Sequence, residues 1–475
     1  MSFIALIAAI VALAWTPILL ARSSLAVAGV VFVVLANCFG LEFMSIDVGP
    51  INMSIERFLL LALPIAYVVQ RRAGKLDPKP FERADWALVG LIGFMIVSTF
   101  SHDWQSASAF GAPVIQHLIN GYLIPLVLFW IVRQTKITAR ELRNVYAGLV
   151  AFGVYLALTG IAESLGAWSF VFPKYIANAE IGLHFGRARG PMVHAVTYGM
   201  ALATCMFCGW MLWPGSSRRT QLALLALLPL ALAAIYFSKT RSVWLGAALG
   251  TGILMLTQFR GAWRPLLFGG AVGIGLLVTV VNFERIVAFD RKDNTAAQTR
   301  ESAESRQSFL YVSWQMFKDK PLFGFGFGQF PTQKLPYLSD RDTDLQLEAI
   351  RPWSHHNTYL SVLTELGLVG LALFVGILAA WAVRGWQLWR DPEAPAWVQN
   401  HGALMLAVLA MYAMQCLFHE MSFTARDNSL VFLMAGLTSG LHAMATRPAE
   451  QSAWQTARSW SLSWHWPSVR NAARG

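Results

Sequence analysis

Charge is scarce in this sequence. Only 13% of its 475 residues are charged and 56% are hydrophobic, whereas a soluble domain carries about 25% charged residues. This composition excludes an ordinary soluble domain. Stretches such as "FIALIAAIVALAWTPILLA" approach the ~20 residues that cross a bilayer as a helix. We therefore expect an all-α fold, a polytopic membrane-embedded helical bundle with about 12–13 spans.

Motifs for metals, redox chemistry and nucleotides are also scarce. Cys205 and Cys208 have CxxC spacing, but within an apolar run we interpret them as small packing residues. The stretch "GFGFGQF" at 324–330 lacks the lysine and the βαβ pattern of a phosphate-binding loop, and we interpret it as a turn whose phenylalanines enter lipid. Asp342 and Asp344 are interpreted as part of a solvated loop. We expect neither a metal nor a cofactor.

The apolar runs divide the chain into four parts. We expect ten spans within 1–282, a long loop at 283–355, further spans within 356–445, and a tail at 446–475. The predicted spans lie near 3–21, 25–43, 55–70, 86–101, 119–132, 144–165, 191–213, 220–237, 242–258, 265–282, 356–383, 401–418 and 429–445. Within the loop, "ESAESRQSFLYVSWQMFKDK" predicts an amphipathic helix that lies on the membrane or caps a cavity.

Lys and Arg are distributed unequally between the two sides of this topology. Twenty of them fall on one side, against seven in the short loops of the other. By the positive-inside rule, the richer side and the tail are cytoplasmic and the long loop is extracytoplasmic. The net charge of +11 fits this bias together with attraction to anionic lipids, so it does not call for nucleic acid as a partner.

The basic residues that go against this bias are the more informative ones: Arg57, Lys174, Arg187, Arg189, Lys239, Arg241 and Arg426. Several of them come just before a span that enters the membrane from the outer side. Arginine beside a helix N-terminus favours an anion, typically a phosphate. The alternative interpretation is that each arginine anchors its helix at lipid headgroups.

Two histidines, His355 and His356, stand where the long loop meets a span. A helix N-terminus and nearby arginines disfavour imidazolium, and a neutral imidazole can act as a general base. Adjacent helical residues differ by ~100° in direction, which disfavours a metal site made of both rings. Glu163 is a rare acid inside an apolar run and predicts a pairing with an arginine or a position beside a cavity.

Three stretches within 238–374, taken together, resemble the bacterial O-antigen ligase and O-antigen polymerase family of GT-C-like membrane glycosyltransferases. They are "SKTRSVWLG", "SRQSFLYVSWQMFKDKPLFGFGFGQF" and "HHNTYLSVLTELGLVGLALF". The resemblance implies that Arg241 and Arg306 hold a pyrophosphate and that His356 is the base. Arg187 and Arg189 match the family's preceding arginine region more loosely. His355 falls on a variable position, and we treat it, with Lys239, as secondary.

The family's chemistry implies transfer of a glycan from an undecaprenyl-pyrophosphate carrier to a sugar hydroxyl, on a growing glycan or on lipid A core. The transfer would occur at the periplasmic face of the bacterial inner membrane, without a metal or a nucleotide sugar. The local motifs do not separate an O-antigen ligase from an O-antigen or exopolysaccharide polymerase. Two alternatives remain, namely glycan transfer to a protein hydroxyl and a flippase or transporter for lipid-linked glycans. A transporter favours internal repeats and charges spread through its spans.

Overall fold

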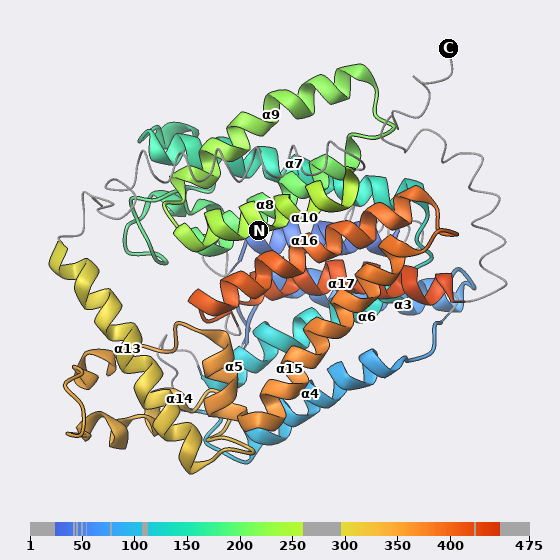
Figure 1. Ribbon diagram of the computed structural model, residues 1–475. Coiled ribbons are helices and arrows are strands. Elements are labelled where there is room, and N and C mark those ends of the chain that lie inside the picture. The colour runs from blue at the N-terminus through green and yellow to red at the C-terminus, as the bar shows by residue number, and fades with distance from the viewer. Residues whose placement is uncertain are drawn as a thin grey trace.

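The computed structural model describes residues 24–40, 43, 46–48, 51–53, 55–76, 78–106, 113–259, 296–421 and 424–446. Over these residues the chain is a helical bundle, so the expected all-α class is confirmed (Figure 1). Eight of the described helices are long and apolar enough to cross a membrane, as expected of a polytopic membrane protein. The predicted spans 3–21 and 265–282, and the tail from 447 onward, lie outside the described residues.

Residues 25–164 supply one short hairpin and six of the described α-helices. The hairpin pairs β1 (Ile46–Val48) with β2 (Ile51–Met53). The helices, with the π-helical turn η1, are α2 (Leu25–Cys38), α3 (Ile55–Arg72), α4 (Arg83–Phe100), α5 (Val114–Leu118), η1 (Ile119–Leu123), α6 (Ile124–Arg133) and α7 (Ala139–Ser164).

The rest of the chain continues the bundle and adds a region outside it. Its α-helices are α8 (Ala195–Leu212), α9 (Arg218–Phe237), α10 (Arg241–Gln258), α13 (Ala296–Asp319), α14 (Phe330–Gln333), α15 (Thr358–Arg390), α16 (Ala396–Phe418) and α17 (Ala425–Ala445). Short 3-10 turns are η2 (Trp168–Phe170), η3 (Lys174–Ala177), η4 (Gly190–Met192), η5 (Leu335–Ser339) and η6 (Leu347–Ile350).

Polar side chains fix where several of these helices begin. Thr138 and Glu141 form a capping box at the start of α7. The side chain of Asn357 accepts from the backbone N–H of Leu360 at the start of α15, and His194 accepts from Thr197 at the start of α8. Each cap satisfies a backbone donor that the helix itself leaves unpaired. The residues beside the expected anion site therefore also define the helix starts.

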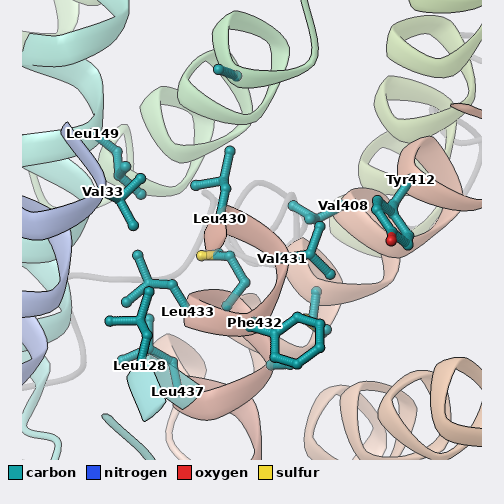
Figure 2. Packing of buried hydrophobic residues seen from close by; sticks show 14 of the residues in the cluster. Val33, Leu128, Leu149, Val408, Tyr412, Leu430, Val431, Phe432, Leu433 and Leu437 are labelled. Carbon is teal, nitrogen blue, oxygen red and sulfur yellow. The ribbon is translucent and has the colours of Figure 1, made fainter. Parts of the chain in front are cut away.

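Helix α17 runs through the core of the bundle. Figure 2 shows Leu430, Val431 and Leu433 of α17 directed toward Val33 of α2 on one side and Val408 of α16 on the other. These side chains are buried. In a bilayer, helices associate through close packing rather than through exclusion of water. Gly436 serves this packing, because a Cβ there would lie 2.7 Å from the carbonyl oxygen of Phe129 in α6.

A buried ion-pair network joins α4, α6 and α15 at one end of the bundle. Asp85 accepts from Arg133 at 2.5 Å and from Arg384 at 3.0 Å, and Arg384 also contacts Glu82 at 2.7 Å. Arg133 and Asp85 are almost completely buried. Two of the arginines that mark the predicted cytoplasmic side are therefore paired inside the protein.

Replacing Asp85 by Ala should lower the free energy of unfolding by about 3–5 kcal/mol, since it leaves buried cations without their partner. Thermal unfolding of the purified protein measures the change. Glu348→Ala is the matched control, because Glu348 pairs with Arg351 at a site where both side chains are more than half exposed. Equal melting temperatures for the two variants would contradict the structural role of the network.

The long loop folds into a lobe with its own small core. This lobe, residues 305–354, contains most of α13 together with α14, η5 and η6. Figure 1 shows α13, in yellow, at the end of the bundle where α10 and α15 begin. Its apolar core is separate from that of the bundle and consists of Phe309, Val312, Met316, Phe325, Phe330, Leu338, Leu347 and Ile350.

Candidate functional site

Five helix termini meet beside the lobe. Ser242 at the start of α10 bonds His419, just past the end of α16, with 2.7 Å between Oγ and Nε2. Thr358 at the start of α15 donates to the His419 carbonyl. Thr197 at the start of α8 donates to Asp427 in the first turn of α17 at 2.7 Å. We call this junction the site end. It directs the positive ends of four helix dipoles to one region.

Histidines and arginines from distant segments gather at the site end. Burial, reinforced by the charges of His194, His356, Arg306 and Arg187, lowers the pKa of His419 to about 3. His419 therefore lies within electrostatic range of four residues from distant parts of the chain, which span positions 187 to 356. Of these groups, Arg187 and Arg306 carry positive charge, and arginines at helix N-termini are suited to bind a phosphate or pyrophosphate.

His356 is the exposed histidine of this group. Its ring lies edge-on to Phe309 of α13, with 5.2 Å between the ring centroids. The protein packed around it removes part of its water, and this desolvation together with the charge of Arg306 lowers the pKa of His356. The imidazole is consequently neutral at pH 7 and accessible, as a general base requires.

His355 points in a different direction, into the lobe. Its side chain is buried, its Nε2 lies 2.9 Å from the hydroxyl of Thr364, and its ring packs on Phe330 with 3.5 Å between centroids. Burial, followed by the charges of Lys334 and His356, holds its pKa well below the usual value. The two adjacent histidines therefore have different surroundings, and His355 packs the lobe against α15.

Arg241 and Lys239 flank the start of α10. Arg241 is its first residue, is exposed, and precedes the Ser242 that bonds His419. Lys239 has a φ of +47°, and its ammonium donates to the carbonyl of Gly186 at 3.2 Å. Lys239 thus connects the α9–α10 turn to the segment that carries Arg187. Arg241 and Arg187 are placed on two sides of the same junction.

Arg189 differs from Arg187 because it is fully enclosed. Its guanidinium lies 3.5 Å from Glu163 of α7 and donates to the carbonyls of Ile176, Asn178 and Ile181. The pairing with an arginine expected for Glu163 is therefore observed. Since these partners occupy its donors, Arg189 organises the segment before α8, and we leave it out of the pyrophosphate-binding group proposed below.

The "GFGFGQF" turn wraps around Glu365 of α15. Its carboxylate accepts from the N–H groups of Gly328 at 2.8 Å and Phe330 at 3.2 Å, and its carbonyl accepts from Gly326. The expectation that the phenylalanines enter lipid is wrong, because Phe325, Phe327 and Phe330 are buried within the protein. An apolar ring can lie in lipid or in a protein core. Here the backbone N–H groups of the turn donate to Glu365 and to the carbonyl of Thr364, and these bonds hold the turn inside the protein.

Helix α15 is broken at Gly367, where φ is +65°. The freed N–H groups of Leu368 and Val369 donate to the carbonyls of Pro321 and Leu322, which follow α13. The break therefore exchanges helical hydrogen bonds for bonds to the lobe. It ties the segment carrying Arg306 to the helix that follows His356.

Sequence reasoning missed His194 and His419. Burial, then the charges of Arg426 and Arg187, lowers the pKa of His194 to about 4, and its Nδ1 lies 2.9 Å from the hydroxyl of Thr197. Both histidines stand where a span begins or ends, the same signal that singled out His356. Among the residues that the structure describes, no three or more His, Cys, Asp or Glu side chains group as metal ligands.

Comparison with known families bears on the same segment. The family model described as O-antigen ligase matches residues 225–375. This segment includes Arg241, Arg306, His356 and Glu365, whereas Arg187 and His419 lie outside it. No curated protein matches the chain. The family implies glycan transfer of the O-antigen ligase or polymerase type, with lipid-linked glycan substrates in a membrane. Over residues 225–375 the chain is therefore similar to the O-antigen ligase family, which supports the resemblance drawn from the three sequence stretches.

Proposed function

We propose that this protein transfers a glycan from an undecaprenyl-pyrophosphate-linked donor to a sugar hydroxyl at the periplasmic face of the bacterial inner membrane. The observation that carries the proposal is the accessible, neutral His356 beside Arg306, at a junction of helix N-termini. A base next to a phosphate-binding region is what a displacement at a glycosyl pyrophosphate requires.

The proposed reaction is a single displacement. The acceptor oxygen attacks the anomeric carbon as the bond from that carbon to the pyrophosphate oxygen breaks, and the electron pair leaves with the pyrophosphate. His356 takes the acceptor proton. Arg241, Arg306 and Arg187, with the four helix N-termini, stabilise the developing negative charge through preorganised electrostatics. One displacement inverts the configuration at the anomeric carbon and needs no covalent glycosyl-enzyme.

The orientation follows from the charge bias of the loops. The lobe lies within the long segment that we assign to the periplasm, and the site end faces it. The carrier's isoprenoid tail would remain in the bilayer while its pyrophosphate meets the arginines. A water-borne acceptor would enter from the lobe side, where His356 is exposed.

Reconstitution into vesicles with an undecaprenyl-pyrophosphate-linked repeat unit tests the proposal. A ladder of products indicates a polymerase, and a single transfer to added lipid A core indicates a ligase. Modification of a protein acceptor alone would indicate an oligosaccharyltransferase with a protein hydroxyl as acceptor. Movement of the donor across the bilayer with no new glycosidic bond would overturn the proposal in favour of a flippase.

Arg241→Lys should lower kcat/KM for the lipid-linked donor about tenfold or more, because a point charge does not replace the planar fork that binds two phosphate oxygens. The assay is initial rate against donor concentration. Arg218→Lys is the matched control, since Arg218, like Arg241, is the first residue of its helix but follows the other, predicted cytoplasmic, loop. Equal effects of the two changes would indicate that Arg241 only anchors its helix.

A further inference from the structure

We infer that His419 is a positioning residue that holds the start of α10, with Arg241, against the start of α15, with His356. The inference deepens the proposed function and rests on it. The sequence does not single out His419, and the family match ends before it. The base and a pyrophosphate-binding arginine keep their relative placement through the segment that ends α16, with His419 at its centre.

Two hydrogen bonds carry the inference. The His419 ring meets the hydroxyl of Ser242, with 2.7 Å between Nε2 and Oγ, and its carbonyl accepts from the Thr358 hydroxyl at 2.8 Å. Ser242 directly follows Arg241, and Thr358 is two residues after His356. One residue therefore touches both helix starts that bear the proposed chemistry.

Neighbouring residues of the same segment extend this connection. The side chain of Gln415 donates to the backbone carbonyl of Ser242 at 2.9 Å. The side chain of Asn357 donates to the carbonyl of Leu417 at 3.0 Å, and the Thr358 hydroxyl accepts from the N–H of Met421 at 2.8 Å. The end of α16 thus bonds to both helix starts, and His419 lies at the centre of these contacts.

The surroundings of His419 favour positioning over a role as the base. Its Nε2 is engaged by Ser242 and its ring is partly buried, whereas the ring of His356 is exposed. Burial and the nearby cations also keep it uncharged at neutral pH, because its pKa lies near 3. A neutral side chain between the cationic groups joins the two helices without adding to their mutual repulsion.

Loss of the hydrogen bond between His419 and Ser242 should lower the rate of glycan transfer. A misplacement of about 1 Å between reacting groups can cost 10²-fold. We expect His419→Ala to lower kcat by about 10- to 100-fold and to raise KM for the donor, since the start of α10 with Arg241 loses its side-chain bond to the segment that remains bonded to Thr358. His419→Gln should recover most of the activity, because its amide can still bond the Ser242 hydroxyl.

The experiment uses full-length protein in vesicles containing the lipid-linked donor. It compares His419→Ala, His419→Gln, Ser242→Ala and the His419→Ala/Ser242→Ala double variant, with His442→Ala, a histidine bonded to Gln387 in the last third of α15, as control. Ser242→Ala should reproduce most of the His419→Ala defect. The double variant should be no worse than either single one, because both remove the same bond. Thermal unfolding checks that each variant is folded.

A distance measurement tests the inference independently of turnover. Spin labels replacing Leu245 of α10 and Trp353 before α15, both exposed, report the separation of the two helix starts. The distance distribution should broaden in His419→Ala and return in His419→Gln. An unchanged distribution with wild-type kcat would overturn the positioning role. Folded His419→Gln as inactive as His419→Ala would overturn it too, by indicating direct chemistry. Failure of the wild-type protein to form any glycosidic bond would instead refute the proposed function.

Discussion

Replacing His356 by Ala should reduce glycan transfer by about 10²- to 10⁴-fold, the usual contribution of a positioned general base. The protein should still fold and insert, because the His356 ring is exposed and lies edge-on to Phe309 at the surface of the lobe. Initial rates in vesicles and thermal unfolding of the same preparation measure the two properties. A variant with wild-type transfer would remove His356 from the mechanism.

The adjacent histidine provides the matched control. His355 is buried and bonded to Thr364, so His355→Ala should lower the melting temperature, with any loss of transfer following the loss of folded protein. The two neighbouring substitutions should therefore separate rate from stability. The opposite pattern, a folded but inactive His355→Ala beside an unstable His356→Ala, would exchange their assigned roles.

The assignment of His356 as the base also fixes the direction in which kcat/KM changes with pH. Only the neutral imidazole accepts a proton, so kcat/KM should fall as the pH drops through the pKa of His356. Desolvation and the charge of Arg306 lower that pKa, which places the fall below the ordinary value near 6.5. Arg306→Gln removes one of the two causes, and the fall should move to higher pH. A pH profile of kcat/KM for both proteins decides this point.

Residues next to one another in sequence proved easier to predict than residues brought together by the fold. His356 and Arg241 were found because each stands at the mouth of an apolar run. His419 also stands at the end of an apolar run, but its role depends on hydrogen bonds to Ser242 and Thr358, which belong to two other helices. Contacts across such sequence separations leave no pattern in a single chain.

Arg187 and Arg189 illustrate a second limit. Both occur in "GRARG" and both precede a span, so hydropathy and charge treat them alike. The structure separates them through Glu163, which pairs with Arg189 and accepts from its backbone N–H at 2.9 Å. A buried acid predicted a basic partner, but the sequence did not say which arginine it would select.

The charge bias of the loops has a similar complication. Arg133 and Arg384 belong to the side rich in Lys and Arg, yet they pair with Asp85 in a buried network. The positive-inside rule counts Lys and Arg residues in the sequence, whether their side chains are exposed to solvent or buried. The assignment of sides therefore depends more on the exposed basic residues of the same loops, namely Arg71, Arg72, Lys75, Arg83, Lys136 and Arg140.

The largest loss of stability is expected from Glu365→Ala. Glu365 is buried, and its carboxylate accepts from the backbone N–H groups of Gly328 and Phe330. Leaving two buried donors without partners at about 1–3 kcal/mol each should lower the free energy of unfolding by about 2–6 kcal/mol. Thermal unfolding and resistance to protease measure the effect. Glu180→Ala, at an exposed acid, is the control and should change neither.

Glu365→Gln distinguishes hydrogen bonding from simple packing. The amide keeps one acceptor oxygen but turns an N–H toward the second backbone donor, so its stability should lie between wild type and Glu365→Ala. Because the turn at 324–330 joins the end of α13 to the break at Gly367, its release should also loosen Arg306 from His356. Transfer by folded Glu365→Gln should therefore fall as well. Wild-type stability in both variants would mean that the turn is held by its buried phenylalanines rather than by Glu365.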